Sequence, residues 1–194
     1  SPGATNSLGS NKALVIDGVI PTVTNVTSTT NDGTYKSGDV IAITVTFSEV
    51  VNVVTTNGTP TLTLETGDSD ASVNYASGSG SNTLTFNYTI ADGQNSSDLD
   101  YASTSALALN SGTIKDVAGN GATLTLASPG ASNSLGANKA IVVDTTPPSI
   151  SQVTSTTNDG TYKSGDVIAI TINLSEAVVV SGTPQLTLET GSSD

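Results

Sequence analysis

Cysteine, histidine, methionine, tryptophan and arginine are all missing from this chain of 194 residues. Without cysteine and histidine there is no disulfide, no thiolate nucleophile and no imidazole base, so most nucleophilic and transition-metal chemistry is excluded. A domain of more than about 100 residues buries enough apolar surface to fold without covalent cross-links. The absence of cysteine therefore points to no particular compartment.

Positive charge is scarce as well. Lysine and arginine together number 5 against 17 acidic residues, a net charge of −12, and the cations are Lys12, Lys36, Lys115, Lys139 and Lys163. Such a chain repels the phosphates of nucleic acid and the surface of an anionic membrane. No stretch approaches about 18 consecutive apolar residues, the length of a membrane-spanning helix. We expect neither nucleic acid nor membrane insertion.

Aromatic residues are few, with 5 tyrosines and 2 phenylalanines. Tyr75, Tyr88 and the phenylalanines fall at inward positions of alternating segments, and Tyr35 and Tyr162 occupy a repeated turn in which we expect them to pack a loop. Paired carboxylates could serve a glycosidase, but not without an aromatic-lined cleft. Serine and threonine are abundant, yet no base is present to activate one. The sequence predicts no enzyme, no catalytic residue and no organic cofactor.

What the chain does have is a long internal repeat. The segment Val26–Thr44, VTSTTNDGTYKSGDVIAIT, returns unchanged at Val153–Thr171, an offset of 153 − 26 = 127 residues. Residues 1–20 match residues 128–147 at the same offset, and three residues are lost between Glu176 and Thr183. A fixed period indicates a tandem array of one unit. We predict that residues 1–20 end one repeat, that 21–147 form a complete repeat, and that 148–194 begin the next within a longer protein.

Apolar and polar residues alternate along almost the whole chain, as in Ile41, Ile43, Val45 and Phe47. This alternation is typical of half-buried antiparallel strands, and clusters of Asn, Asp and Gly between them indicate turns. Nine strands are expected in the complete repeat: roughly 22–28, 40–48, 50–55, 60–66, 72–76, 83–90, 105–115, 122–127 and 138–143. For 105–115, a break at Gly112 is the alternative to one continuous strand. No helix is expected. The predicted fold is all-β, with Ig-like β-sandwich domains joined end to end.

Each repeat ends in an apolar strand capped by an aspartate, Asp17 in LVID and Asp144 in IVVD. The second is followed by TTPP, in which proline stiffens the linker, whereas the first linker keeps only Pro21.

Five segments resemble the tandem Ig-like, or cadherin-like, repeats of giant bacterial surface adhesins, including those of the RTX type. They are VTSTTNDGTYKSGDVIAITVTFSE, GTPTLTLETG, YASGSGSNTLTFNYTI, SSDLDYASTSALALNSGTIKDVAGN and NKALVID. The resemblance implies secretion to the cell surface, neighbouring repeats of the same chain as partners, and Ca²⁺ near the junctions. It implies no defined ligand.

Acidic residues are expected to gather at the two ends of the sandwich. If successive strands alternate in direction, Asp17, Glu49, Asp98 and Asp100 reach the end where the chain enters, as do Asp68 and Asp70. Asp116 and Asn120 then reach the exit end beside Asp144, with Asp32 and Asp39, and the next repeat brings Glu176 there. Ca²⁺ is bound by six to eight such oxygens. The candidate metal ligands are Asp17, Glu49, Asp98, Asp100, Asp116, Asn120, Asp144 and Glu176.

Two interpretations of these acids remain open, namely Ca²⁺ binding and turn formation. Asp, Asn and Gly also build ordinary β-turns, the interpretation we favour for Asp32 and Asp39. No segment has the spacing of an EF-hand loop.

Three functions are compatible with the sequence. The first is an extender segment that projects a binding tip from a bacterial surface, stiffened by Ca²⁺ at the junctions. The second is a module whose end loops bind a glycan or a host surface. The third is a subunit of a surface layer or filament that associates with other copies.

Overall fold

The computed structural model describes residues 3–191 and divides the chain into two compact units, Ser1–Thr145 and Thr146–Asp194. The first unit contains α1 (Leu8–Asn11), β1 (Val23–Ser28), β2 (Gly33–Tyr35), β3 (Val40–Val54), β4 (Thr61–Leu64), β5 (Ala71–Ser77), β6 (Ser81–Thr89), β7 (Leu107–Ala108), β8 (Thr113–Lys115), α2 (Leu135–Asn138) and β9 (Ile141–Val143). The second contains β10 (Ile150–Ser155) and β11 (Ile170–Leu174).

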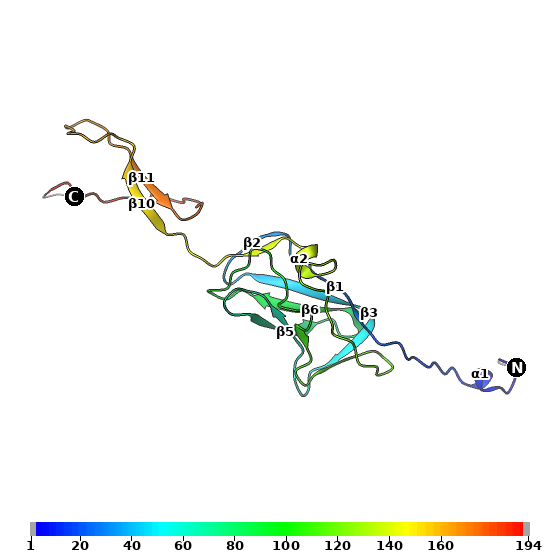
Figure 1. Cartoon of the computed structure of the whole chain (residues 1–194). Helices are drawn as coiled ribbons and strands as arrows, with labels where there is room; N and C mark the ends of the chain where they lie inside the picture. Colours follow the sequence, from blue (N-terminus) through cyan, green and yellow to red (C-terminus); the bar gives the residue numbers. More distant parts are fainter. Residues whose placement is uncertain (1–2, 192–194) are drawn as a thin grey trace. The chain divides into compact units, whose positions relative to one another are not determined.

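One curled antiparallel sheet dominates the first unit (Figure 1). Its strands follow the order β1-β3-β6-β5-β4-β7, and β8 pairs with the second half of β3. A separate parallel pair joins β2 to β9, with Gly33 opposite Ile141 and Tyr35 opposite Val143. The architecture is the all-β sandwich that the alternating pattern predicts.

The core lies between the facing layers of this curled sheet. Ile41, Ile43 and Val45 of β3 are fully buried, as the alternation predicts. Phe86 and Leu84 of the adjacent strand β6 pair with Ile43 and Val45 and are buried beside them. The ring of Phe86 meets Tyr75 edge to face at 6.2 Å, a favoured aromatic geometry. Tyr88 and Phe47 are buried too, which agrees with their predicted core role, whereas Tyr75 is half-buried.

The prediction of separate strands at 40–48 and 50–55 is wrong. Both belong to the single strand β3, which changes partner along its length: Val40–Thr46 pair with β6 and Asn52–Val54 with β8. An irregularity between Thr46 and Val51 separates the two halves. Such bulges bend a strand without reversing it, so the chain does not turn back at residue 49.

Other elements also differ from the prediction. Residues 122–127 form no strand beyond the isolated bridge of Thr123 to Thr22. Residues 105–115 form two short strands, β7 and β8, with Gly112 in the gap between them, which agrees with the expected alternative of a break there. The strand β2 was not expected. Two single-turn helices, α1 and α2, occur where none was predicted, each capped by a serine side chain. Short segments such as these carry no apolar periodicity, so the alternating pattern does not reveal them.

The chain enters and leaves the sandwich at different ends of the part of β3 that pairs with β6. At the entry, Thr22 lies beside Ser48, since its N–H donates to the Ser48 hydroxyl at 3.0 Å. At the exit, the Thr145 hydroxyl accepts a hydrogen bond from Gly93, just beyond the end of β6 that pairs with Val40. From residue 40 to residue 48 a strand spans roughly 26 Å at about 3.3 Å per residue.

The second unit carries the repeat's first hairpin without the rest of a sandwich. β10 and β11 pair in the register of β1 and β3, with the same irregularity near the start of the first strand. Ile170 and Ile172 are exposed, although their counterparts Ile43 and Val45 in the first unit are fully buried. The two hairpins therefore share one register, although their apolar side chains differ in burial.

Candidate metal centre at the entry of the domain

Three carboxylates from distant parts of the first unit meet at the entry. Asp17 belongs to the segment before β1, Glu49 lies within β3, and Asp116 follows β8 directly. One carboxylate oxygen from each residue lies within 4.8 Å of the other two. Asp17 is exposed and Asp116 is buried, with 5% of its surface accessible, so the cluster runs from the solvent into the domain.

Among the three carboxylates of the cluster, Glu49 has a buried oxygen that lacks a hydrogen-bond partner among the described residues. It occupies the irregular stretch of β3, next to Ser48, whose N–H donates to the carbonyl oxygen of Thr22 at 2.8 Å. Its Oε1 is buried and has no hydrogen-bond partner among the described residues. Burial raises the pKa of this carboxyl above its ordinary value, and the charges of Asp17 and Asp116 raise it further. Such an oxygen normally has a partner.

Asp116 is held in place by the tight turn that follows it. Its Oδ1 accepts hydrogen bonds from the backbone N–H groups of Gly119 and Asn120, both at 2.7 Å, and its Oδ2 accepts one from the Asn120 side-chain amide at 2.7 Å. Gly119 has φ of +98°, which only glycine adopts without strain. Burial acts to raise the pKa of Asp116, but these hydrogen bonds outweigh it and the pKa is lowered. Asp116 is thus a fixed carboxylate.

Asn120 ties the incoming segment to this turn. Its Nδ2 lies 3.2 Å from the carbonyl oxygens of both Asp17 and Val19. The Asp17 carboxylate accepts a hydrogen bond from the Val19 N–H at 3.0 Å, and Thr123 donates to the carbonyl oxygen of Pro21 at 2.8 Å. The segment before the domain is therefore anchored close to two of the domain's acids.

This set of atoms fits a hard divalent cation. It offers carboxylate and carbonyl oxygens only, the ligands that Ca²⁺ prefers. A cation would give Glu49 Oε1 its partner and would offset the repulsion among three carboxylates. Asp17, Glu49 and Asp116 are the residues that would hold it, and Asn120 would position two of them.

The sequence places only part of this cluster correctly. Asp17 and Glu49 are neighbours, as predicted. Asp116 and Asn120 were expected at the exit end, which is wrong. The mistake follows from β3, because a strand that does not reverse at residue 49 sends the turns at 67–70, 91–101 and 116–120 to the opposite end.

The same mistake affects Asp98 and Asp100, which lie near the exit. The N–H of Leu99, between them, donates to the carbonyl oxygen of Ile141 at 2.8 Å. Asp100 is buried, and its oxygens accept hydrogen bonds from the N–H groups of Tyr101 at 2.8 Å and Gly130 at 2.9 Å. Asp100 therefore fixes the loop before α2. Neither residue joins the cluster at Glu49.

The loop of Asp68 and Asp70 is likewise near the exit, since Thr66 accepts a hydrogen bond from Asn95 at 3.0 Å.

Asp144 and Glu176 belong to different units. The N–H of Asp144 donates to the carbonyl oxygen of Tyr35 at 2.9 Å, and Glu176 is exposed within the second unit. They are the repeat counterparts of Asp17 and Glu49, and their role as metal ligands stays a prediction.

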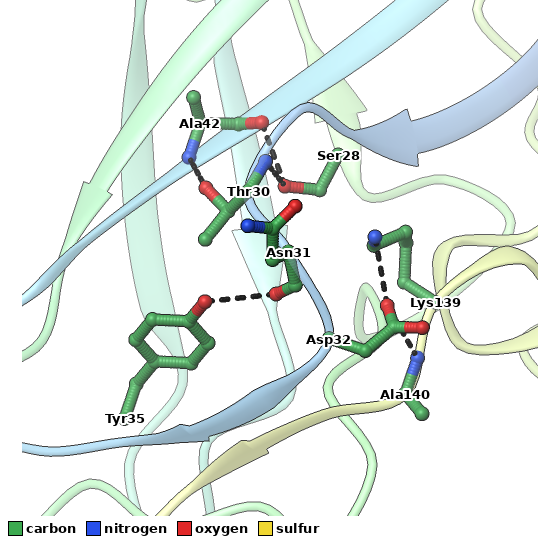
Figure 2. Close-up of polar contacts among 8 residues, drawn as sticks. All are labelled: Ser28, Thr30, Asn31, Asp32, Tyr35, Ala42, Lys139 and Ala140. Carbon is green, nitrogen blue, oxygen red and sulfur yellow. Dashed lines mark hydrogen bonds and ion pairs between the residues drawn. The ribbon is translucent and has the colours of Figure 1, made fainter.

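The repeated stretch forms a hydrogen-bonded module of its own (Figure 2). Ser28 Oγ donates to the Ala42 carbonyl oxygen at 2.8 Å, the Ala42 N–H donates to Thr30 Oγ1 at 2.9 Å, and the Tyr35 hydroxyl donates to the Asn31 carbonyl oxygen at 2.8 Å. The second unit repeats these bonds through Ser155, Thr157 and Tyr162, the last to Asn158. The same side-chain bonds therefore recur in both units, and Tyr35 packs its loop as predicted.

Asp32 connects this module to the end of the domain. Its carboxylate pairs with Lys139 Nζ at 2.7 Å and accepts a hydrogen bond from the Ala140 N–H at 3.3 Å (Figure 2). The hydrogen bond from Lys139, only partly opposed by burial, lowers the pKa of Asp32. The sequence favours a turn role for Asp32 and does not predict its ion pair, although the lysine in both copies of NKA is a signal for a partner. Asp39 is a turn residue, accepting a hydrogen bond from the Lys36 N–H.

The profile of the bacterial Ig-like domain family matches residues 10–129. The chain belongs to this family. The match includes Asp17, Glu49, Asp116 and Asn120. No curated protein and no solved structure matches the chain.

Membership in the bacterial Ig-like family sets the general role. Domains of this family typically occur in extracellular and surface proteins, as structural or binding modules, and are in general not enzymes. No helix among residues 3–191 is long and apolar enough to cross a membrane.

Proposed function

We propose that this chain is an extender segment of a large bacterial surface protein, and that Ca²⁺ stiffens the joint where the chain enters the domain. The observation that carries the proposal is the convergence of Asp17, from the incoming segment, with Glu49 and Asp116 of the domain. A cation bound by all three would couple the segment to the domain.

The position of entry and exit supports the extender role. The chain enters beside Ser48 and leaves beside Gly93, at different ends of the part of β3 that pairs with β6. A domain traversed in this way adds its length to an array instead of folding the chain back. The net charge of −12 favours a soluble, extracellular polymer that attracts cations.

When bound, Ca²⁺ would supply charge neutralisation and a rigid set of metal–oxygen bonds. Glu49 would contribute its unpartnered Oε1, and Asp116 a carboxylate already oriented by the turn at Gly119. Asp17 would contribute the exposed ligand, so its binding would restrict the segment. Extracellular calcium modules bind with Kd on the order of 10⁻⁴–10⁻³ M, a range suited to a joint that is rigid outside the cell.

The test is a calcium titration of the chain followed by calorimetry and by thermal unfolding. We expect saturable binding and, at a Ca²⁺ concentration about 100-fold above Kd, a stabilisation of about 2.7 kcal/mol. Glu49→Gln should lose this gain. The control Glu65→Gln, which alters an exposed carboxylate outside the cluster, should keep it. Calcium binding that is equal in Glu49→Gln and Glu65→Gln would refute the assignment of the site.

A further inference from the structure

We propose that the groove between β5 and β6 binds an extended, basic peptide segment of a partner protein, which pairs through its main chain with the free edge of β5. The proposal rests neither on calcium nor on the extender role. Three features of the first unit support it, namely two strand edges that face the groove, an apolar floor, and acidic residues at the mouth of the groove.

The groove forms where β5 and β6 diverge. The pairing of the two strands ends at Tyr75, which lies opposite Phe86. Over residues 71–73 β5 pairs only with β4, and over residues 88–89 β6 pairs only with β3. The groove between them has a volume of about 540 Å³. Its lining consists of residues 70–76 and 87–89 and Gln94.

Ser72 directs its main-chain groups toward the groove. The Tyr75 N–H donates to the Pro60 carbonyl oxygen at 2.8 Å, on the side of β4. Successive residues of a paired strand direct their N–H and C=O groups to opposite sides. Val73 therefore also faces β4, and Ser72 faces away from it. No described strand pairs with Ser72 on that side.

Thr89 faces the groove from the opposite wall, which β6 forms. The Ile90 N–H donates to the Asp39 carbonyl oxygen at 3.0 Å, and the Ile90 carbonyl oxygen accepts a bond from Gly38 at 2.9 Å, both on the side of β3. By the same alternation Thr89 faces away from β3. Main-chain groups at a free strand edge are a template for one more strand. A peptide that adds such a strand obtains its affinity from main-chain hydrogen bonds.

Buried side chains form the floor of the groove. Val73 and Tyr88 line it and are 5% and 2% exposed. The Tyr88 hydroxyl donates to Gln94 Oε1 at 2.8 Å, and the same oxygen accepts a bond from the Ala91 N–H at 2.9 Å, so the floor is held in place. Because side chains alternate along a strand, every second side chain of the bound peptide would face this floor. Those side chains should be apolar.

The mouth of the groove is acidic. Asp70 lines the groove just before β5, and Asp68 lies in the same loop. Asp92 lies in the loop after β6, which a hydrogen bond from the Asn95 N–H to the Thr66 carbonyl oxygen joins to the first loop. All three aspartates are exposed and have no ion pair among the described residues, and no lysine lines the groove. Charge complementarity therefore favours lysine or arginine at the end of the peptide that lies there.

The groove suits a peptide better than a glycan. A glycan site normally offers an exposed aromatic face on which a sugar ring stacks, and Tyr75 is the aromatic residue of the lining that is not buried. Its ring packs edge to face on Phe86 at 6.2 Å, and its hydroxyl accepts a hydrogen bond from the Ser79 N–H at 2.8 Å. The ring is thus engaged within the domain, whereas the main-chain groups of Ser72 and Thr89 match those of a peptide.

Peptide binding to the whole chain tests the proposal. The probe is a fluorescein-labelled peptide with the sequence KKTVTVT, whose lysines would meet the mouth and whose valines would face the floor. We expect saturable binding in fluorescence anisotropy, several-fold weaker binding of EETVTVT, and no binding of KKTVTVT methylated on each threonine and valine nitrogen, which cannot donate main-chain hydrogen bonds. Equal binding of the three peptides, or binding of none, would overturn the proposal.

Hydrogen exchange locates the bound peptide. In the isotope-labelled chain, NMR should show slower exchange of the Ser72 amide when KKTVTVT is added, while the amides of β10 and β11 stay unchanged. Binding that leaves the Ser72 amide unprotected would contradict the proposal. Protection by maltoheptaose and not by the peptide would assign the groove to a glycan instead and would equally overturn it.

Two variants of Ser72 separate its N–H from its side chain. Ser72→Pro removes the N–H that faces the groove and keeps the bonds to β4, since proline is tolerated where the N–H of a strand has no partner. Affinity for KKTVTVT should fall about tenfold, the equivalent of roughly one main-chain hydrogen bond. The control Ser72→Ala keeps the N–H and should bind normally. Equal affinities in the two variants, both folded by circular dichroism, would contradict pairing with β5, and the methylated peptide tests the same bond if Ser72→Pro does not fold.

Asp70→Asn tests the acidic mouth. This variant should bind KKTVTVT several-fold more weakly and should bind the neutral peptide TTTVTVT as before, because that peptide brings no charge to the mouth. The control Asp159→Asn removes an exposed carboxylate from the second unit and should change neither affinity. Equal weakening in Asp70→Asn and Asp159→Asn would contradict recognition of a basic segment at this mouth.

Discussion

At the scale of single residues, Glu49 is the clearest mark of a function beyond folding. A buried carboxylate oxygen without a partner, beside two further carboxylates, destabilises a domain that has no cation to neutralise it. Nothing in the packing of β3 requires a charge at this position.

The raised pKa of Glu49 gives a pH-dependent prediction for the metal-free chain. A carboxyl with a raised folded pKa is unfavourable when charged, and this cost disappears as pH falls through that pKa. Glu49→Gln should therefore raise Tm in a chelator at pH 7, and the gain should vanish as pH falls toward the ordinary glutamate value of about 4.3. Thermal melts at several pH values measure it. A constant gain at all pH values would show that the charge of Glu49 is not responsible.

Asp32 has the opposite pKa shift, so its contribution has the opposite pH dependence. Its lowered pKa means that the ion pair with Lys139 stabilises the domain at neutral pH and is lost as pH falls through the lowered value. Asp32→Asn should lower Tm at pH 7, with the deficit shrinking in strong acid. The matched control is Asp159→Asn, the same position in the second unit, where no ion pair is present among the described residues. Equal losses in both variants would contradict this role for Asp32.

At the scale of elements, two turns at the ends of β6 contain glycines with positive φ. Gly78, between β5 and β6, has φ of +110°, and a Cβ there would lie 2.2 Å from the Thr83 carbonyl oxygen. Gly93 also has positive φ, +84°, but a Cβ there would meet no atom within 4 Å. Alanine at Gly93 would therefore add backbone strain alone, whereas alanine at Gly78 would add backbone strain and a steric clash.

Substitution of these glycines by alanine tests that distinction. Gly93→Ala should cost about 1–2 kcal/mol of unfolding free energy, the strain of a left-handed conformation. Gly78→Ala should cost clearly more, since it adds a clash with the backbone. Denaturant unfolding of both variants gives the comparison. Equal costs would mean that the β5–β6 turn relaxes to admit a side chain.

The sequence predicts the strands better than it predicts their connections. Alternation locates β1, β3, β4, β5 and β6 because each strand buries one face. It cannot show that β3 continues through the irregular stretch at Glu49, because a bulge and a turn use similar residues. Because of that single ambiguity, the sequence places Asp116 and Asp98 at the wrong ends of the predicted sandwich. The alternating pattern also cannot predict the pairing of β2 with β9. Each strand has only three residues, and the two are more than 100 positions apart in the sequence.

At the scale of the whole molecule, the repeat of the proposed extender would provide length, and the joint at Asp17 would decide whether that length is stiff. Asn120 and Thr123 donate hydrogen bonds to backbone carbonyl oxygens of the incoming segment. These bonds would align the segment with the domain but would still allow it to detach. Calcium on Asp17, Glu49 and Asp116 would add bonds that water and salt do not replace easily. We therefore expect calcium to stiffen this joint.

Electron–electron distance measurements between two spin labels test the claim most directly. Labels on Ala13→Cys and Thr55→Cys, both at exposed positions, would report the segment against the domain, with labelled chain diluted in unlabelled chain to suppress distances between copies. We predict a broad distance distribution in chelator that narrows when Ca²⁺ is added, and a distribution that stays broad in the same chain with Glu49→Gln. A width that calcium leaves unchanged, or narrows equally in Glu49→Gln, would contradict the account.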